Sequence, residues 1–475
     1  MSENKYQALR EQLTYAPKNG HARISDQGKT EMEAYCKRYM AFLNAAKTER
    51  EAVRETVRQA EAAGFRPYTP GMEMTPGTKV YSVNHAKAIN LAVIGKKSLA
   101  EGTRITAAHI DNPRLDLKPN PLYEDSELAF FKTHYYGGIK KYQWTTVPMA
   151  IHGVVAKKDG TVVEICIGEK DDDPIFIVTD LLIHLSEEQM KKSLATGVTG
   201  ENLNLLVGSM PMPEDDGADS VKLAVLYYLH ETYGITEEDF LSAELTLTPA
   251  AKARELGFDR SMIAAYGHDD RVCAYPSMAA VLNYEGTPEY TLAAVLTDKE
   301  EIGSVGATGM GAMYFENTMA ELIACVTGED KPLTLRRCLQ NSRMLSSDVS
   351  AGFDPNFAGV FEKRNASIVG NGVTFNKFTG SRGKSGSNDA NAEFVAQVRR
   401  ICDEANVCWQ TAELGKVDVG GGGTIAYICA KYGMNVIDCG IPVLSMHAPW
   451  EVISKVDLWE EYKCYCAFLK GAREF

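Results

Sequence analysis

The sequence predicts an α/β protein in which a mainly β segment interrupts a larger α/β domain. Apolar runs of strand length alternate with helical patterns up to about residue 111 and again after residue 242, which is typical of a sheet covered by helices. In between, the pattern changes to paired strands and polar loops. We therefore expect one domain built from residues 1–119 and 242–475, with an insertion at 120–241.

The first part of the chain is predicted to form a helix and then to enter the sheet. Apolar residues recur at helical spacing over 25–63, where Ser25 or Asp26 can cap the helix and Gly64 can end it. The segment 111–125 carries three prolines, so we expect it to break regular structure. Strand composition predicts the next elements at 79–83, 88–95 and 105–111.

The rest of the chain shows the same signals. A turn at 158–160 joins two predicted strands in the insertion, and a helix is predicted over 220–234, ending at Gly234. The remaining elements are strands at 242–249 and 290–298, a helix within 306–326, and a strand at 416–419 that leads through four glycines into a further helix.

Composition excludes several classes of function. The 475 residues include 50 basic and 63 acidic side chains, a formal charge of −13, which disfavours nucleic acid or an anionic membrane as the main partner. No apolar run approaches the roughly 20 residues that span a bilayer, and residues 1–10 show no secretory signal. The eleven cysteines form no CxxC pair, which is typical of a reducing compartment. We therefore expect a cytoplasmic protein.

Histidines and acids stand where strands are predicted to end. His109 and Asp111 lie on one face of a strand, so Asp111 can accept the second ring N–H of a metal-binding histidine; a surface histidine beside an acid is the other interpretation. Acids that follow a strand occupy the usual site crevice of an open α/β sheet. Further candidates stand in the runs His268-Asp269-Asp270, Asp298-Lys299-Glu300-Glu301, Ser347-Asp348 and Ser445-Met446-His447.

These segments, taken in order, resemble the motifs of the aspartyl aminopeptidase and aminopeptidase I family of two-metal exopeptidases. The matching runs are AHID, HDDRV, DKEEIGS, SSDV and SMHAPWE, and the resemblance extends from about residue 79 to 460. It implies a three-layer αβα catalytic domain of the zinc-exopeptidase type with an inserted, mainly β dimerisation domain. It also implies a hydrolase that removes the N-terminal residue of peptides.

The resemblance assigns a role to each candidate. Asp269 is expected to bridge two metal ions, with a cis peptide bond to Asp270, and Glu300 to act as the general base. Asp111 is the second candidate catalytic residue. His109 and Asp348 are expected to complete one metal site, and Glu301 and His447 the other. Zn²⁺ suits such nitrogen and carboxylate ligands, although Co²⁺ or Mn²⁺ can occupy them.

The resemblance also implies an assembly. Family members pair through the inserted domain and build a tetrahedral dodecamer, in which a histidine of the insertion reaches a neighbouring active site. His184, in an apolar run of the insertion, is the best match. A core histidine on a strand is the other interpretation of this residue.

Other interpretations remain open at this level. Gly421-x-Gly423-x-x-Ala426 fits a dinucleotide fingerprint within residues 416–438, which would make the protein an NAD-dependent enzyme. A non-catalytic scaffold with the same fold is a third class. Lys377, Arg382 and Lys384 can bind an acidic substrate side chain or form a solvated loop, so acidic and neutral N-terminal residues both remain possible substrates.

Overall fold

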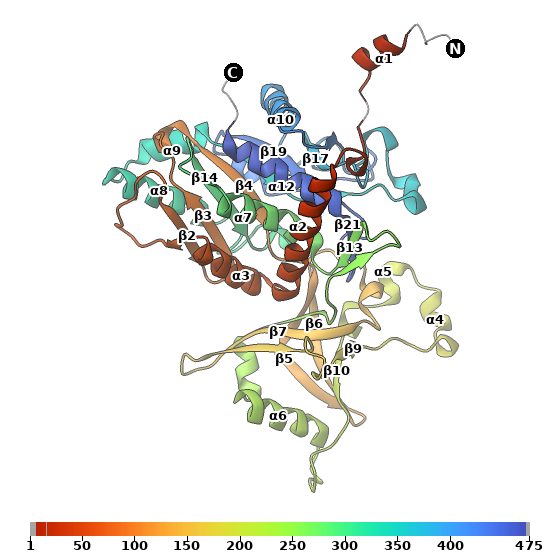
Figure 1. Cartoon of the computed structure of the whole chain (residues 1–475). Coiled ribbons are helices and arrows are strands. Elements are labelled where there is room, and N and C mark those ends of the chain that lie inside the picture. The colour runs from red at the N-terminus through yellow and green to blue at the C-terminus, as the bar shows by residue number, and fades with distance from the viewer. Residues whose placement is uncertain (1–5, 16, 472–475) are drawn as a thin grey trace.

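The computed structural model describes residues 6–15 and 17–471, and it shows a helix-covered sheet that carries a second sheet at one end (Figure 1). The main sheet has nine strands in the order β1-β2-β3-β14-β4-β15-β19-β17-β18. Its central strands β14, β4, β15 and β19 are mutually parallel. The bounds are β1 Arg66–Pro67, β2 Lys79–Asn84, β3 Ala88–Val93, β4 Thr103–His109, β14 Thr291–Thr297, β15 Arg343–Ser347, β17 Val373–Asn376, β18 Trp409–Thr411 and β19 Asn435–Gly440.

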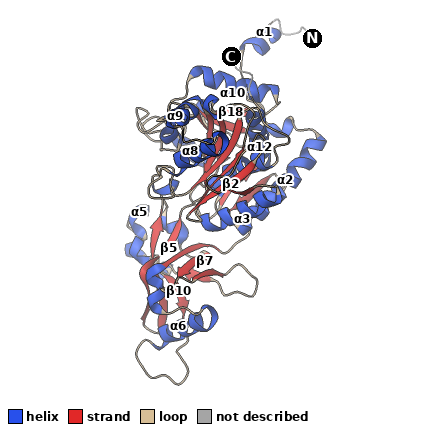
Figure 2. Ribbon diagram, turned by 90° about the vertical axis from the view of Figure 1, so that its left-hand side faces the viewer, coloured by secondary structure: helices blue, strands red, loops and turns tan. Residues whose placement is uncertain are grey.

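Helices cover both faces of this sheet, so the domain has three layers (Figure 2). Alternate strand residues divide between two cores: Leu91 packs with one helical layer and Ala92 with the other, as the two-residue period of a strand requires. One layer holds α2 Asp26–Ala45, α3 Glu49–Ala62, α7 His268–Leu282, α10 Ala392–Glu404 and α12 Lys455–Lys470. The opposite layer holds α8 Tyr314–Thr327, α9 Pro332–Asn341 and α11 Ala426–Ala430.

The second sheet belongs to the predicted insertion and has its own core. Its order is β11-β5-β6-β10-β9-β7-β8, and α6 Ser220–Tyr233 packs on it. The sheet runs from Arg114 to Pro249, wider than the insertion expected at 120–241. The bounds are β5 Arg114–Asp125, β6 Leu128–Tyr136, β7 Pro148–Ala156, β8 Val162–Ile167, β9 Phe176–Val178, β10 Leu205–Gly208 and β11 Ala243–Pro249.

Smaller elements complete the described chain. Strands β12 Arg254–Leu256, β13 Met262–Ala265 and β21 Glu451–Ser454 form a three-stranded sheet, and β16 Ser350–Ala351 pairs with β20 Pro442–Val443. The short helices are α1 Gln7–Leu13, α4 Glu187–Met190 and α5 Leu194–Gly197. Within the described residues, no helix has both the length and the apolar character needed to cross a bilayer.

Two sequence-based expectations for the first 125 residues were wrong. The helix expected over 25–63 is two helices, because Thr48 starts a new one: its side chain accepts the Glu51 backbone N–H, and the Glu51 carboxylate accepts the Thr48 N–H. The segment 111–125 does not break regular structure, because β5 spans most of it. Its internal prolines fall where the pairing with β6 shifts register, between Leu117 and Leu122, a place where the missing N–H is tolerated.

Candidate active site

The candidate residues gather at the carboxyl ends of the parallel strands. His109 is the last residue of β4, Glu300 and Glu301 open the 3-10 turn that follows β14, and Asp348 follows β15. Parallel strands end at the same edge of a sheet, so ligands from segments far apart in the sequence meet there. The long gap from His109 to the next candidate, Asp269, accommodates the second sheet.

Asp269 lies at the centre of the cluster. It opens α7 in a non-helical conformation, and the Asp269–Asp270 peptide bond is cis, as expected from the resemblance. One carboxylate oxygen, Oδ1, lies 3.1 Å from His109 Nε2. The other, Oδ2, lies 3.2 Å from His447 Nε2. A single buried carboxylate therefore faces two histidines, one from each side.

The remaining distances suit metal coordination. His447 Nε2 lies 3.7 Å from Glu301 Oε2, and His109 Nε2 lies 4.0 Å from Asp348 Oδ1. Donors that share one tetrahedral ion with bonds of about 2.0–2.2 Å are themselves about 3.3–3.6 Å apart. The side chains therefore stand close to the spacing that divalent cations require, and small rotations would complete it.

Buried oxygens without partners point to the same conclusion. Glu301 Oε1 and both carboxylate oxygens of Asp270 are buried and have no hydrogen-bond partner among the residues that the structure describes. Such atoms are costly in a low-dielectric interior unless something satisfies them. Two groups of described residues at this site have the spacing of metal ligands: His109, Asp270 and Asp348 form one, and His109, Asp269 and Glu301 form the other.

The electrostatics of the cluster favour bound cations. Burial, reinforced by neighbouring carboxylates, raises the pKa of Glu301 and Asp348 well above their ordinary values. Burial also works against ionisation of Asp269, yet the hydrogen bonds from His109 and His447 hold its pKa below the usual range. Burial, with Asp269 and Asp111 nearby, raises the pKa of Glu300 to about 7. Crowded acids of this kind ionise readily only when positive charge is added.

A further set of residues orients this cluster. Asp111 Oδ1 lies 3.2 Å from His109 Nδ1 and accepts the Glu300 backbone N–H at 3.1 Å. Glu451 accepts the backbone N–H of Asp269 at 3.0 Å and that of His447 at 2.8 Å. The contact with Asp111 can keep the His109 ring in one orientation when a metal binds. The contacts with Glu451 hold the backbone at Asp269 and His447.

The cluster opens into a cavity of about 480 Å³. Gly421, Gly422 and Gly423 form one wall, beside Thr424 and Tyr427. The segment 416–419, expected to be a strand, is a turn followed by irregular chain, so the strand that a dinucleotide fingerprint requires is missing. The NAD interpretation is therefore not supported.

His184 lies in the second sheet's domain, away from any core. It belongs to the 3-10 turn Ile183–Leu185, whose residues are all exposed. The interpretation as a core histidine on a strand is wrong, because the apolar run around it covers no core of this chain.

Some residues of the site were not predicted. Asp270 was expected only as the partner of Asp269 in a cis peptide bond, and Glu451 was not predicted, although it follows His447 by four residues. Tyr136 donates to Asp111 Oδ2 at 2.8 Å, and the Gly138 carbonyl accepts from His447 Nδ1 at 2.6 Å. The run Tyr-Gly-Gly at the end of a strand was the available signal, since adjacent glycines permit close backbone approach.

Comparison with known proteins agrees with this arrangement. The sequence model of a family described as "Aminopeptidase I zinc metalloprotease (M18)" matches residues 42–469. A Clostridium acetobutylicum protein named "Probable M18 family aminopeptidase 1" is 53% identical over 458 residues, which cover 96% of this chain and 98% of that protein.

Solved structures extend the comparison to the fold. The crystal structure of an M18 aminopeptidase from Thermotoga maritima superposes with a TM-score of 0.91 at 44% identity, covering 96% of this chain and all of that one. The S. cerevisiae mApe1 dodecamer, at 20% identity, shares the fold with a TM-score of 0.73 over 91% of this chain and 96% of that one.

A family match over most of the chain, with high identity to an aminopeptidase relative along its whole length, assigns the activity class as well as the fold. The protein is a hydrolase of the metallo-exopeptidase class, and it belongs to the aminopeptidase I zinc metalloprotease (M18) family.

Proposed function

We propose that the protein removes the N-terminal residue of peptides with two divalent cations held on either side of Asp269. The observation that carries this proposal is the pair of contacts at 3.1 and 3.2 Å, in which the two oxygens of one buried carboxylate face His109 and His447 separately. A carboxylate that spans two cations about 3.5–4 Å apart is the usual core of a two-metal hydrolase site.

The proposed ligand sets follow from these contacts. His109 and Asp348 belong to one ion, Glu301 and His447 to the other, and Asp269 to both. Asp270 stands within ligand distance of His109 and Asp348, so its carboxylate adds to the negative charge that favours a cation there. Zn²⁺ is the proposed metal. When bound, the two cations polarise the scissile carbonyl and acidify the attacking water.

Glu300 is the proposed general base. Its carboxylate faces the cluster, 4.0 Å from His109 Nε2, and it lines the cavity. A pKa of about 7 suits a group that must take a proton from water and pass it to the leaving amine. Asp111 accepts the backbone N–H groups of Glu300 and Glu301 and so fixes the turn that carries the base.

The cavity lining indicates the substrate class. Among the described residues that line it, no lysine or arginine is present. Lys377 and Lys384 both pair with Asp389 instead. An acidic side chain would therefore enter a cavity rich in carboxylates without a cation to receive it. We propose that peptides with neutral N-terminal residues are the preferred substrates.

The exposed apolar segment around His184 supports an oligomer. Leu182, Ile183 and Leu185 are 58–71% exposed, an arrangement that marks an interaction surface. We propose that the inserted domains pair two subunits, that the dimers build a tetrahedral dodecamer, and that His184 serves a neighbouring active site. Cytoplasmic location stays a prediction.

One set of measurements tests the proposed function. Metal analysis of the purified protein is expected to give about two zinc ions per subunit, and chelation is expected to abolish release of N-terminal residues. A panel of aminoacyl substrates headed by Asp, Glu, Leu and Met is expected to show faster turnover for Leu and Met. Metal-independent activity would contradict the mechanism, and preference for Asp would contradict the substrate class.

A further inference from the structure

We infer that the segment Tyr136–Gly138, where the inserted sheet returns to the catalytic domain, is a positioning element for both halves of the metal site. The inference rests on the proposed function. It adds that the inserted domain, besides its expected role in assembly, holds groups that orient the two ligand histidines of its own subunit.

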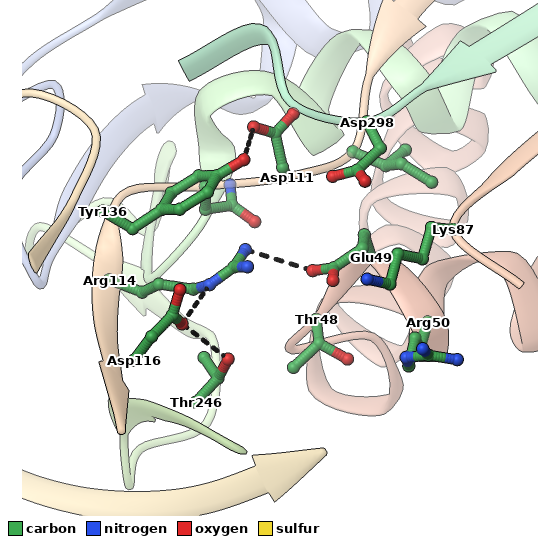
Figure 3. Close-up of polar contacts among 12 residues, drawn as sticks. Thr48, Glu49, Arg50, Lys87, Asp111, Arg114, Asp116, Tyr136, Thr246 and Asp298 are labelled. Atoms are coloured by element: carbon green, nitrogen blue, oxygen red, sulfur yellow. Dashed lines mark hydrogen bonds and ion pairs between the residues drawn. The ribbon is translucent and has the colours of Figure 1, made fainter. Parts of the chain in front are cut away.

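Tyr136 acts on the His109 side. It ends β6, and its hydroxyl donates to Asp111 Oδ2 at 2.8 Å, as Figure 3 shows. His109 Nδ1 lies 3.0 Å from the backbone carbonyl oxygen of Asp111 and 3.2 Å from its Oδ1. Tyr136 therefore orients the carboxylate of a residue that contacts the first histidine twice, and the same carboxylate receives the backbone N–H groups of Glu300 and Glu301.

The inserted sheet holds Tyr136 in place. Arg114 pairs with Tyr136 across β5 and β6, and its guanidinium lies 4.0 Å from the centre of the tyrosine ring. Arg114 also binds Asp116 within the inserted sheet at 2.8 Å and Glu49 of α3 at 3.1 Å. Figure 3 shows this chain of contacts between the two domains. The position of the hydroxyl is thus set by how the inserted sheet sits on the catalytic domain.

Gly137 and Gly138 act on the other side. The Gly138 carbonyl accepts from His447 Nδ1 at 2.6 Å, so the protein backbone orients the second histidine. Gly137 has a φ of 73°, and a Cβ at this position would lie 3.2 Å from Glu301 Oε2. Glycine thus allows the chain to pass directly against one proposed ligand while it holds another.

One three-residue segment therefore supplies the partner of the second ring nitrogen of His447 and binds the carboxylate of Asp111, the residue whose backbone and side chain contact that of His109. Partners of this kind set ring orientation, and their loss lowers metal affinity by about 10–100-fold. The tyrosine acts through Asp111 and the glycine acts directly through its carbonyl. The segment is expected to matter for metal binding even though none of its side chains is a proposed ligand.

The first test removes one hydroxyl. Tyr136→Phe keeps the ring beneath Arg114 and deletes the donor to Asp111. Zinc affinity of the metal-stripped protein, measured by competition with a chromogenic chelator, is expected to fall about 10-fold or more, with an unchanged Tm of the metal-free protein. At saturating zinc, kcat is expected to fall while KM stays. Tyr135→Phe, at the exposed neighbouring position, is the matched control and should behave as wild type.

The second test adds one methyl group. Gly137→Ala brings a Cβ against Glu301, whereas Gly160→Ala imposes the same kind of backbone strain (φ 87°) at a turn where nothing lies within 4 Å. Both variants carry the strain of a positive φ, and the contact with Glu301 is expected to make the loss of stability larger for Gly137→Ala. Weaker zinc binding is expected for Gly137→Ala alone.

The outcomes distinguish failure of the positioning role from failure of the proposed function. If wild type binds zinc and is zinc-dependent, but Tyr136→Phe and Gly137→Ala match their controls in zinc affinity, the positioning role is overturned and the proposed function stands. If wild type itself shows no zinc-dependent peptidase activity, the proposed function fails first, and the inference fails with it.

Discussion

A histidine held between two carboxylates occurs at two places in the molecule, and the surroundings differ. In the active site, His109 contacts Asp269 and Asp111, and buried oxygens of Glu301 and Asp270 have no hydrogen-bond partner in the described part of the chain. At the domain junction, His152 of β7 lies 2.8 Å from Glu51 of α3 and 3.1 Å from Glu169.

The acids at the junction are already satisfied. Glu51 accepts backbone N–H groups of Lys47 and Thr48, and Glu169 lies 3.9 Å from the Lys47 ammonium. Unmet acceptors facing a cavity indicate a metal site, whereas a closed set of partners indicates an ion cluster that joins domains. Residue types alone do not separate the two, since Glu51, His152 and Cys166 also have ligand spacing.

The largest expected effect comes from neutralising one carboxylate in each cluster. Asp269→Asn removes the charge shared by the two proposed cations, so zinc content is expected to fall from about two per subunit to one or fewer, and peptidase activity to disappear. Glu51→Gln, the matched change at the junction, should keep zinc content and activity. Elemental analysis and a peptidase assay measure both. Equal zinc loss in the two variants would contradict the conclusion that only the cluster around Asp269 binds metal.

Replacing the proposed base should separate chemistry from metal binding. Glu300→Gln keeps the shape of the side chain but cannot accept a proton, so kcat is expected to fall about 10²–10⁴-fold while zinc stays bound. Steady-state kinetics with zinc analysis on the same sample gives both quantities. Turnover near the wild-type rate would reject Glu300 as the base.

At the junction the expected effect is on stability and depends on pH. Burial lowers the pKa of His152, but hydrogen bonds with Cys166, Glu169 and Glu51 outweigh burial and raise it well above its ordinary value. A histidine with a raised folded-state pKa stabilises the fold fully below about pH 6.5, its unfolded value, and loses this contribution as pH rises through the folded-state pKa.

His152→Gln is therefore expected to lower the free energy of unfolding by about 1.5–3 kcal/mol near pH 6, and by less at pH 9. Urea unfolding of the zinc-loaded protein at both pH values measures the difference. A loss that is the same or larger at pH 9 would show that His152 is not held as an imidazolium.

The sequence indicated the proposed ligands better than the residues that orient them. His109, Glu301 and Asp348 were predictable because metal ligands follow strand ends and stand in short motifs. Tyr136 and Gly138 were not predicted, because a backbone carbonyl has no residue signature and both act on segments distant in the chain. Their roles appear only when the register of β5 and β6 brings the strand end back to the cluster.

The secondary structure was likewise predicted in some places and missed in others. The paired strands β7 and β8, the end of α6 at Gly234 and the strands β2 and β3 were predicted from composition and turn residues. The break between α2 and α3 was missed although Thr48 and Glu51 form a capping box, because apolar spacing continues across it. In β5, pairing with two neighbouring strands outweighs the local preference of its prolines.

The smallest expected effect is the most direct test of the comparison. Cys166 of β8 is exposed, and in the ion-cluster interpretation its thiol contributes little beyond a weak hydrogen bond. Cys166→Ser is expected to change the free energy of unfolding by no more than about 0.5 kcal/mol and to leave about two zinc ions per subunit. If the wild type instead holds a third ion that Cys166→Ser removes, the junction is a metal site, and the satisfied hydrogen bonds of Glu51 do not distinguish the two clusters.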